Sequence, residues 1–290
     1  MSGPAIYRAW DQTELNRQMN ARGTVADIAP FVRAYAQESA RCRKSLPCHL
    51  DVPFGPLSVE RLDIFPSAKP GLSPVFVFIH GGYWRLLNAS DSSFMAETLT
   101  RAGACVVAVN YGLAPETSLA EIVRQCRAAL GWIGQNIATY GGDPSRIHVS
   151  GSSAGGHLAA MMLAPGWQQG AGLGPRTIAS ASLLSGLYDL EPVQMSEVNG
   201  WINLDRAGAR SLSPQRHLPD WPVPMVVAYA PNETEEFKRQ SEIYAAACVA
   251  RGSDVEMLVP PGTNHYDLPL ELMKPGSALT RAVLRLMRLG

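Results

Sequence analysis

One segment of the chain reads Arg146-Ile147-His148-Val149-Ser150-Gly151-Ser152-Ser153-Ala154-Gly155-Gly156. Its first five residues predict a strand, and the small apolar residues at 154–163 predict a helix. A serine at such a turn, with glycine two residues before and two residues after it, forms the G-x-S-x-G pattern of a nucleophile elbow. Only Ser153, and not Ser152, meets that condition. We expect Ser153 to be a catalytic nucleophile above the sheet edge, at the positive end of the helix.

A second glycine motif, His80-Gly81-Gly82-Tyr83-Trp84, follows directly after an apolar run at 75–79. Glycines let the backbone approach a substrate closely, and backbone N–H groups stabilise the negative oxygen that develops on a carbonyl under attack. We expect two amides from Gly81, Gly82 and Tyr83 to act together with the amide of Ala154. An ordinary glycine turn would explain this loop alone, but its pairing with a downstream elbow favours an oxyanion hole.

Serine needs a neighbouring base to become a good nucleophile, and in chains with such an elbow the order is serine, acid, histidine. His265 lies in a loop after the last predicted strand, at 255–259, and is the expected base. His217 lies among prolines and is predicted to be a surface residue. His148 and His157 fall in a strand and a helix, and we expect structural roles for them.

The acid is expected after the strand predicted at 225–229, where three glutamates compete: Glu233, Glu235 and Glu236. The last two fall in the first turn of the next helix, where the helix dipole favours carboxylates for reasons unrelated to catalysis. Glu233 is therefore the preferred acid. Two further carboxylates stay open as alternatives: Asp254 and Asp267.

Apolar runs alternate with helical patterns along the chain, which predicts an α/β fold with a mostly parallel central sheet and helices on both faces. Two runs rich in β-branched and aromatic residues, at 75–79 and 104–109, predict strands buried on both faces. Further strands are predicted at 146–150, 179–184, 225–229 and 255–259. Residues 57–65 alternate between apolar and polar, which predicts a half-exposed strand. The main helices are predicted at 119–137, 154–163, 235–250 and 277–289.

Two segments stand outside this alternation. Residues 1–50 predict an N-terminal helical arm on the core, and residues 186–222, with their turn residues, prolines and tryptophans, predict a small lid or pocket-wall insertion. The expected site residues are spread from 153 to 265 and must meet at one sheet edge. We therefore predict one domain over residues 1–290.

The composition argues against several classes of protein. Lys and Arg total 25 and Asp and Glu total 25, whereas nucleic-acid binders usually carry a basic excess. No apolar stretch approaches the ~18 residues that span a bilayer, and no signal peptide is visible, so we expect a cytoplasmic protein. The five cysteines are scattered, and neither a metal-ligand spacing nor a nucleotide-binding glycine motif occurs. We expect a small-molecule substrate and neither a metal nor a cofactor.

With these motifs the sequence resembles an α/β-hydrolase of the hormone-sensitive-lipase-like group, and within it the arylformamidase (kynurenine formamidase) family. Residues 80–84 match that family's H-G-G-x-W motif, and three further segments resemble its members or related esterases: 141–147, 236–241 and 20–22. The sequence departs at Ala230, where relatives carry glycine, and at Glu233, where many carry aspartate.

The resemblance implies the α/β-hydrolase fold and hydrolysis of an N-formyl aromatic amine such as N-formylkynurenine, with Tyr83 and Trp84 suited to an aromatic group. Three hypotheses follow. The first is a serine hydrolase that cleaves a small aryl formamide through an acyl-enzyme. The second is a carboxylesterase on short-chain or aryl esters, and the third is a non-catalytic binding protein on the same fold. The sequence is compatible with a homo-oligomer.

Overall fold

A single eight-stranded sheet, in the order β1-β2-β4-β3-β5-β6-β7-β8, runs through the computed structural model, which describes residues 3–289. The first two pairings, β1 with β2 and β2 with β4, are antiparallel, and the others are parallel. This agrees with the predicted mostly parallel sheet. The strands are β1 His49–Pro53, β2 Arg61–Phe65, β3 Ser73–Ile79, β4 Cys105–Val109, β5 Gly142–Ser152, β6 Ile178–Leu184, β7 Met225–Ala228 and β8 Val255–Leu258.

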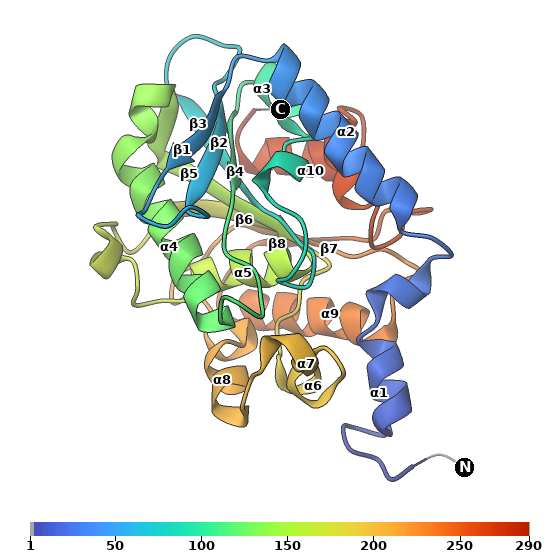
Figure 1. Cartoon of the computed structure of the whole chain (residues 1–290). Coiled ribbons are helices and arrows are strands. Elements are labelled where there is room, and N and C mark those ends of the chain that lie inside the picture. Colours follow the sequence, from blue (N-terminus) through green and yellow to red (C-terminus); the bar gives the residue numbers. More distant parts are fainter. Residues whose placement is uncertain (1–2, 290) are drawn as a thin grey trace.

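Helices cover both faces of the sheet (Figure 1). Along β3, Val75, Val77 and Ile79 belong to one buried apolar cluster, and Phe76 and Phe78 to a second. The first cluster also contains residues of α4 Leu119–Asn136, α5 Ala154–Leu163 and α9 Glu235–Ala250. The second contains residues of α2 Ala29–Ser45, α3 Ala96–Ala102 and α10 Ala278–Leu286. Because strand side chains alternate between faces, each β3 residue packs into the core on its own side.

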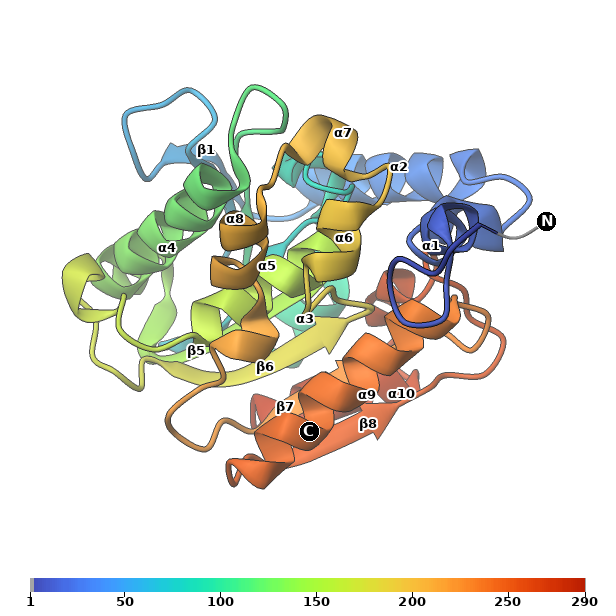
Figure 2. The ribbon, with the colours of Figure 1, turned by 90° about the horizontal axis from the view of Figure 1, so that it is seen from below.

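The helical arm and the insertion both contain short helices. The arm holds α1 Gln12–Gln18 and η1 Ala21–Thr24 before α2. The insertion holds α6 Glu191–Met195, α7 Asn199–Ile202, α8 Arg206–Ser211 and η5 Pro214–Arg216, and Figures 1 and 2 show its α-helices grouped next to α5. The remaining short helices are η2 Ala89–Asp91, η3 Ile137–Tyr140, η4 Gln169–Ala171 and η6 Pro269–Met273. The single-domain organisation of residues 1–290 stays our prediction.

The predicted half-exposed strand at 57–65 was wrong in length and in exposure. The strand begins at Arg61, and the polar residue at its centre, Asp63, is buried. Asp63 pairs with Arg43 of α2 and accepts a hydrogen bond from the backbone N–H of Asp51 in β1. The arm and β1 therefore cover this strand, and an ion pair satisfies the polar position that the alternation assigned to solvent.

The parallel register brings the loops of interest together. Ile79, the last residue of β3, pairs with Gly151 of β5, and Ser152 pairs with Leu184 of β6. Leu184 in turn pairs with Ala228 at the end of β7. Consequently the loops that leave the carboxyl ends of these strands emerge side by side, which is where α/β sheets bind ligands. No helix within residues 3–289 is long and apolar enough to cross a membrane.

Candidate active site

Ser153 occupies a sharp turn between β5 and α5. Its backbone has φ +59° and ψ −120°, a conformation rare for a residue with a side chain. A Cβ atom on Gly151 would lie 2.1 Å from the carbonyl oxygen of Gly155, and one on Gly155 would lie 2.0 Å from that of Ile79. The backbone N–H of Ser153 donates to the carbonyl of Leu184 over 2.8 Å. Both flanking glycines are thus sterically required, as the elbow motif predicts.

We expect Gly155→Ala to destabilise the protein by about 3 kcal/mol, at the upper end of overpacking costs, because the new methyl group meets backbone atoms. These atoms are the carbonyl oxygens of Ile79 and His80, at 2.0 and 2.6 Å. The turnover rate of this variant should fall as well, because the turn that presents Ser153 must shift. Gly170→Ala is the matched control, since a Cβ atom there meets nothing within 4 Å. Urea unfolding midpoints measure the difference, and equal midpoints would contradict the steric argument.

His265 lies beside the preferred acid. Its Nδ1 is 3.2 Å from Oε1 of Glu233, and both side chains are buried. The same carboxylate oxygen accepts hydrogen bonds from the hydroxyl of Ser185 and from the backbone N–H of Ala230, the latter over 3.3 Å. These donors hold the carboxylate at the end of β6 and β7. Ser153 and His265 both line one cavity of about 820 Å³, so the structure brings the predicted nucleophile and base to the same space.

The other candidate acids are engaged elsewhere. Glu236 is buried in an ion pair with Arg239, 2.5 Å away. Asp267 accepts hydrogen bonds from the backbone and the side chain of Asn264 and so ties together the loop that carries the histidine. Two more alternatives are exposed to solvent: Glu235 and Asp254. Within residues 3–289, Glu233 is the carboxylate that pairs with His265.

The N-terminal arm braces the acid and base loops. The hydroxyl of Thr234, next to the acid, donates to the carbonyl of Gln18 over 2.6 Å. On the base loop, the carbonyl of Tyr266 accepts a hydrogen bond from the hydroxyl of Tyr35, and the ring of Tyr266 stacks on that of Phe31 with centroids 6.0 Å apart. Sequence reasoning missed these contacts, because they join residues more than 200 positions apart in the chain.

His148 and His157, which were expected to be structural, are both buried and hydrogen-bonded within the fold. His157 is buried, and its Nε2 donates to the carbonyl of Leu212 over 2.8 Å. His148 contacts the hydroxyl of Ser180 on the neighbouring strand. Burial lowers the pKa of each to about 4, so both rings are neutral near pH 7. The predicted surface residue, His217, is only partly exposed and lies in the loop after η5.

The glycine loop after β3 approaches the elbow closely. A Cβ atom on Gly81 would lie 2.7 Å from the carbonyl oxygen of Ser152. The next three residues have positive φ: +96° at Gly82, +50° at Tyr83 and +60° at Trp84. Non-glycine residues in this region are strained, by of order 1 to 3 kcal/mol each. Ala154, the other expected oxyanion residue, is the first residue of α5, where backbone N–H groups have no partner within the helix.

A tyrosine that the sequence analysis did not single out orients this loop. The hydroxyl of Tyr111 donates to the carbonyl oxygens of His80, at 2.8 Å, and Gly81, at 3.3 Å. Nδ1 of His80 also donates to the carbonyl oxygen of Gly81, over 2.9 Å. Burial lowers the pKa of His80 to about 4. Because C=O and N–H point in opposite directions in a trans peptide, fixing the carbonyl of Gly81 also fixes the direction of the Gly82 amide.

The two aromatic residues of this motif have different surroundings. Tyr83 lines the cavity, and its hydroxyl donates to the carbonyl of Met19. Trp84 is fully buried in the core, where its Nε1 donates to Nδ1 of His157 over 3.3 Å. The structure therefore brings only Tyr83 to the cavity. Trp84 instead anchors the strained loop to α5, and it lies outside the residues that line the cavity.

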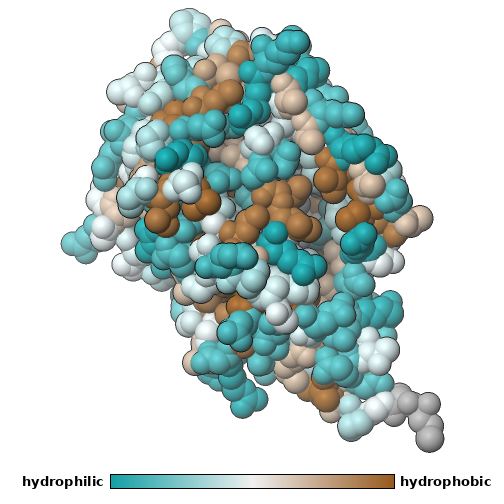
Figure 3. Space-filling view, in the orientation of Figure 1, coloured by the Kyte–Doolittle hydropathy of each residue, from teal (hydrophilic) through white to brown (hydrophobic). Residues whose placement is uncertain are grey.

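The cavity has an apolar interior and a charged rim. Its apolar wall comes from α2, β3 and the segment after η2, through Val32, Tyr35, Phe78 and Phe94. Figure 3 shows hydrophobic side chains near the middle of this face and beside α2, bordered by hydrophilic ones. Trp201 of the predicted insertion also lines the cavity, so that segment forms part of the wall. Among residues 3–289, no group of three or more His, Cys, Asp or Glu side chains is placed to hold a metal ion.

The chain is similar to known hydrolases along most of its length. Residues 76–267 match a family model described as alpha/beta hydrolase fold. A kynurenine formamidase of Danio rerio is 33% identical over 266 residues, which cover 90% of this chain and 89% of that protein. A kynurenine formamidase of Salmo salar is 31% identical over 294 residues, with coverages of 99% and 97%.

Two solved structures have similar folds. A protein of Silicibacter sp. tm1040, named as a candidate thioesterase, has a TM-score of 0.80 at 25% identity and covers 93% of this chain and 98% of its own. A thermostable carboxylesterase from a metagenomic library has a TM-score of 0.68 at 20% identity, with coverages of 98% and 99%. The predicted fold class is thereby confirmed.

Proposed function

The chain belongs to the alpha/beta hydrolase family and is a hydrolase, and from this premise we propose that it releases formate from small aryl formamides through a serine triad. One observation carries the proposal: the elbow serine, Ser153, lines the same cavity as His265, and Nδ1 of His265 faces the carboxylate of Glu233. The choice of a formamide is supported by the kynurenine formamidases, which match over nearly the whole chain.

In the proposed reaction, Ser153 Oγ attacks the formyl carbon while His265 takes the serine proton. The negatively charged oxygen of the tetrahedral intermediate accepts hydrogen bonds from backbone N–H groups of the 81–83 loop and of Ala154. His265 then gives the proton to the departing aryl nitrogen, the C–N bond breaks, and the free amine leaves a formyl-serine ester. Water, deprotonated by His265, attacks this ester, and formate departs as Ser153 recovers its proton. Glu233 holds His265 in the tautomer whose Nε2 is free to accept the proton, and stabilises the imidazolium.

The size of the cavity supports a small aromatic substrate. Its volume of about 820 Å³ falls in the range of small-molecule sites, and its apolar wall suits an aromatic ring. Tyr83 and Trp201 lie edge to face on this wall with ring centroids 6.1 Å apart. We propose that these two rings, and not Trp84, contact the aryl group.

We expect kcat/KM for N-formyl-L-kynurenine to exceed that for p-nitrophenyl acetate by at least about tenfold, the scale of discrimination that a single group in a pocket provides. Release of formate and of p-nitrophenol measures the two activities. Hydrolysis of the ester alone would favour the carboxylesterase hypothesis. Absence of labelling by a fluorophosphonate probe, which reacts with activated serines, would favour a non-catalytic binding protein.

A further inference from the structure

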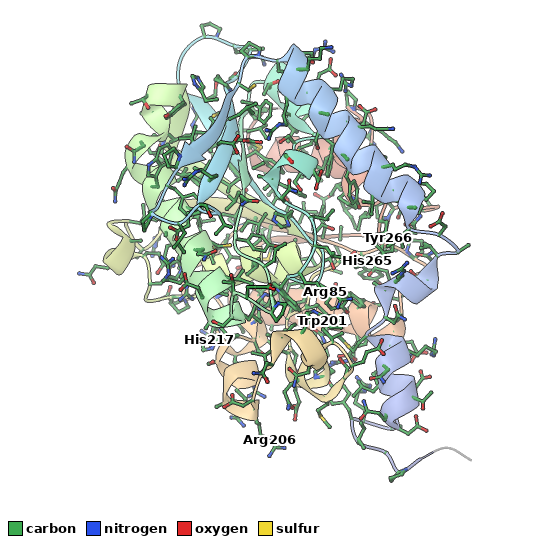
Figure 4. The ribbon with its side chains drawn as sticks, viewed as in Figure 1. Arg85, Trp201, Arg206, His217, His265 and Tyr266 are labelled. Atoms are coloured by element: carbon green, nitrogen blue, oxygen red, sulfur yellow. The ribbon has the colours of Figure 1, made fainter. Side chains whose placement is uncertain are left out.

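A second cavity, of about 410 Å³, lies against α4. Its walls come from α4, from Trp167 and η4 beyond the end of α5, and from Phe54 after β1. None of the residues that line it also lines the cavity that holds Ser153. Figures 1 and 2 show η4 and the helical arm on opposite sides of α4, and Figure 4 shows His265 on the side of the arm. The second cavity is therefore separate from the candidate active site.

The spacing of residues along α4 explains how this cavity forms. Residues three or four positions apart share one face of a helix. The α4 wall of the cavity has this spacing and consists of Arg124, Arg127, Ala128, Gly131, Trp132 and Gln135. The short helix η4 comes close to this face: a Cβ atom on Gly131 would lie only 3.1 Å from the carbonyl oxygen of Ala171, and Nε2 of Gln135 donates to the same oxygen over 3.2 Å. These contacts hold η4 against α4, and the cavity lies between the two segments.

Arg127 brings a positive charge without a counter-charge to this cavity. Within residues 3–289 it makes no salt bridge, and its Nε is buried without a hydrogen-bond partner. Burial lowers its pKa, but an arginine side chain stays protonated in proteins. The neighbouring Arg124 is different, because it pairs with Glu60 and Glu121 at 2.6 and 2.7 Å. The guanidinium of Arg127 has therefore lost water without gaining a partner of opposite charge.

Aromatic rings make up much of the remaining wall. The indole rings of Trp132 and Trp167 are both half-buried, and the guanidinium carbon of Arg127 lies 5.7 Å from the ring centroid of Trp167. Nε1 of Trp167 donates to the carbonyl of Met162 over 3.1 Å, which fixes the orientation of that indole. Aromatic side chains pack favourably against other rings, stacked or edge to face. The cavity thus combines ring surfaces with one cation, and its volume is within the range of small-molecule sites.

We propose that this second cavity binds a small aromatic carboxylate, with its ring against Trp132 and Trp167 and its carboxylate accepting hydrogen bonds from Arg127. The carboxylate supplies the charge that Arg127 lacks, and hydrogen bonds between ionised groups are stronger than neutral ones. A neutral aromatic compound would leave the guanidinium uncompensated, and an inorganic anion would leave the indole rings in water. The proposal does not depend on the serine triad, because the two cavities share no residue.

The test titrates the full-length protein with two probes that share one ring system: 2-naphthoate, which is anionic, and 2-naphthamide, which is neutral. Isothermal titration calorimetry measures both dissociation constants. We expect 2-naphthoate to bind at least about tenfold more tightly, because only its carboxylate makes a charged hydrogen bond. Arg127→Gln keeps a planar polar group but removes the charge, and should raise the Kd of 2-naphthoate about tenfold and abolish the preference over the amide. Equal Kd values for the two probes, or no binding of millimolar 2-naphthoate, would overturn the proposal.

Two further variants locate the bound probe. Arg85→Gln is the matched control, because Arg85 lines the first cavity, close to His265 in Figure 4, and its loss should leave the Kd of 2-naphthoate unchanged. Ala128→Phe adds a ring to the second cavity from α4 and removes no charge, so it should abolish binding even if Arg127→Gln does not fold. Weaker binding in Arg85→Gln with normal binding in Ala128→Phe would assign the probe to the first cavity and overturn the proposal.

Discussion

Ser153→Ala is expected to lower kcat by about 10⁵-fold, because it removes the proposed attacking atom while the rest of the site stays in place. The proposed oxyanion amides and the cavity remain, so a residual rate above that of water should persist. Alanine has no larger side chain than serine and meets the same backbone strain at φ +59°. The fold should therefore survive the change.

Ser152→Ala is the control for this variant. Ser152 also lines the cavity, but it lacks the flanking glycines of the elbow. We expect its kcat to stay within about tenfold of the unaltered protein, since no attacking atom is lost. Steady-state kinetics and mass spectrometry after fluorophosphonate labelling measure both variants. Near-normal turnover by Ser153→Ala, or a label on a different residue, would exclude the proposed acyl-enzyme.

Glu233→Gln is expected to lower kcat by about 10⁴-fold, the effect of removing the charge from a triad acid. The carboxylate of Glu233 faces Nδ1 of His265 at 3.2 Å. A glutamine keeps the shape but presents a neutral amide, which neither selects the reactive tautomer reliably nor stabilises the imidazolium. The stopped-flow or steady-state rate with the preferred formamide measures the loss.

Two variants test the assignment of the acid. Glu235→Gln removes an exposed carboxylate two residues away and should leave kcat within about twofold, as expected of a surface change. Glu233→Asp keeps the charge on a shorter side chain and should recover part of the activity lost in Glu233→Gln. A large loss in Glu235→Gln, or none in Glu233→Gln, would reassign the acid.

Local sequence patterns predicted the parts of the site that depend on local geometry. The elbow is one turn of backbone, and the glycines at 151 and 155 are required by atoms a few residues away or on the adjacent strand. The central strands were predicted for a similar reason, because a strand buried on both faces must be apolar throughout. The positions of Ser153 and His265 followed from chain order and from the rule that loops at the carboxyl ends of parallel strands meet.

Features that depend on distant contacts were not predicted. The strand at 57–65 was misjudged because its polar centre, Asp63, is satisfied by Arg43 of the arm. The strand β1 and the helix α3 also went unnoticed, because short elements have weak periodicity. Trp84 was expected to suit the substrate, yet its ring is buried against His157. An aromatic side chain beside a glycine loop can point either way, and only packing selects the direction.

The sequence by itself therefore determined the fold class, the elbow and the order of the predicted triad, because steric and periodic constraints act over a few residues. The tertiary structure alone decided which of five carboxylates faces His265, since that choice depends on how β6 and β7 align Ser185 and Ala230 around Glu233. It also decided that the arm braces the loops that carry Glu233 and His265, and that Tyr83 rather than Trp84 lines the cavity. Such contacts leave no local pattern, because the residues that make them are separated by tens to hundreds of positions in the chain.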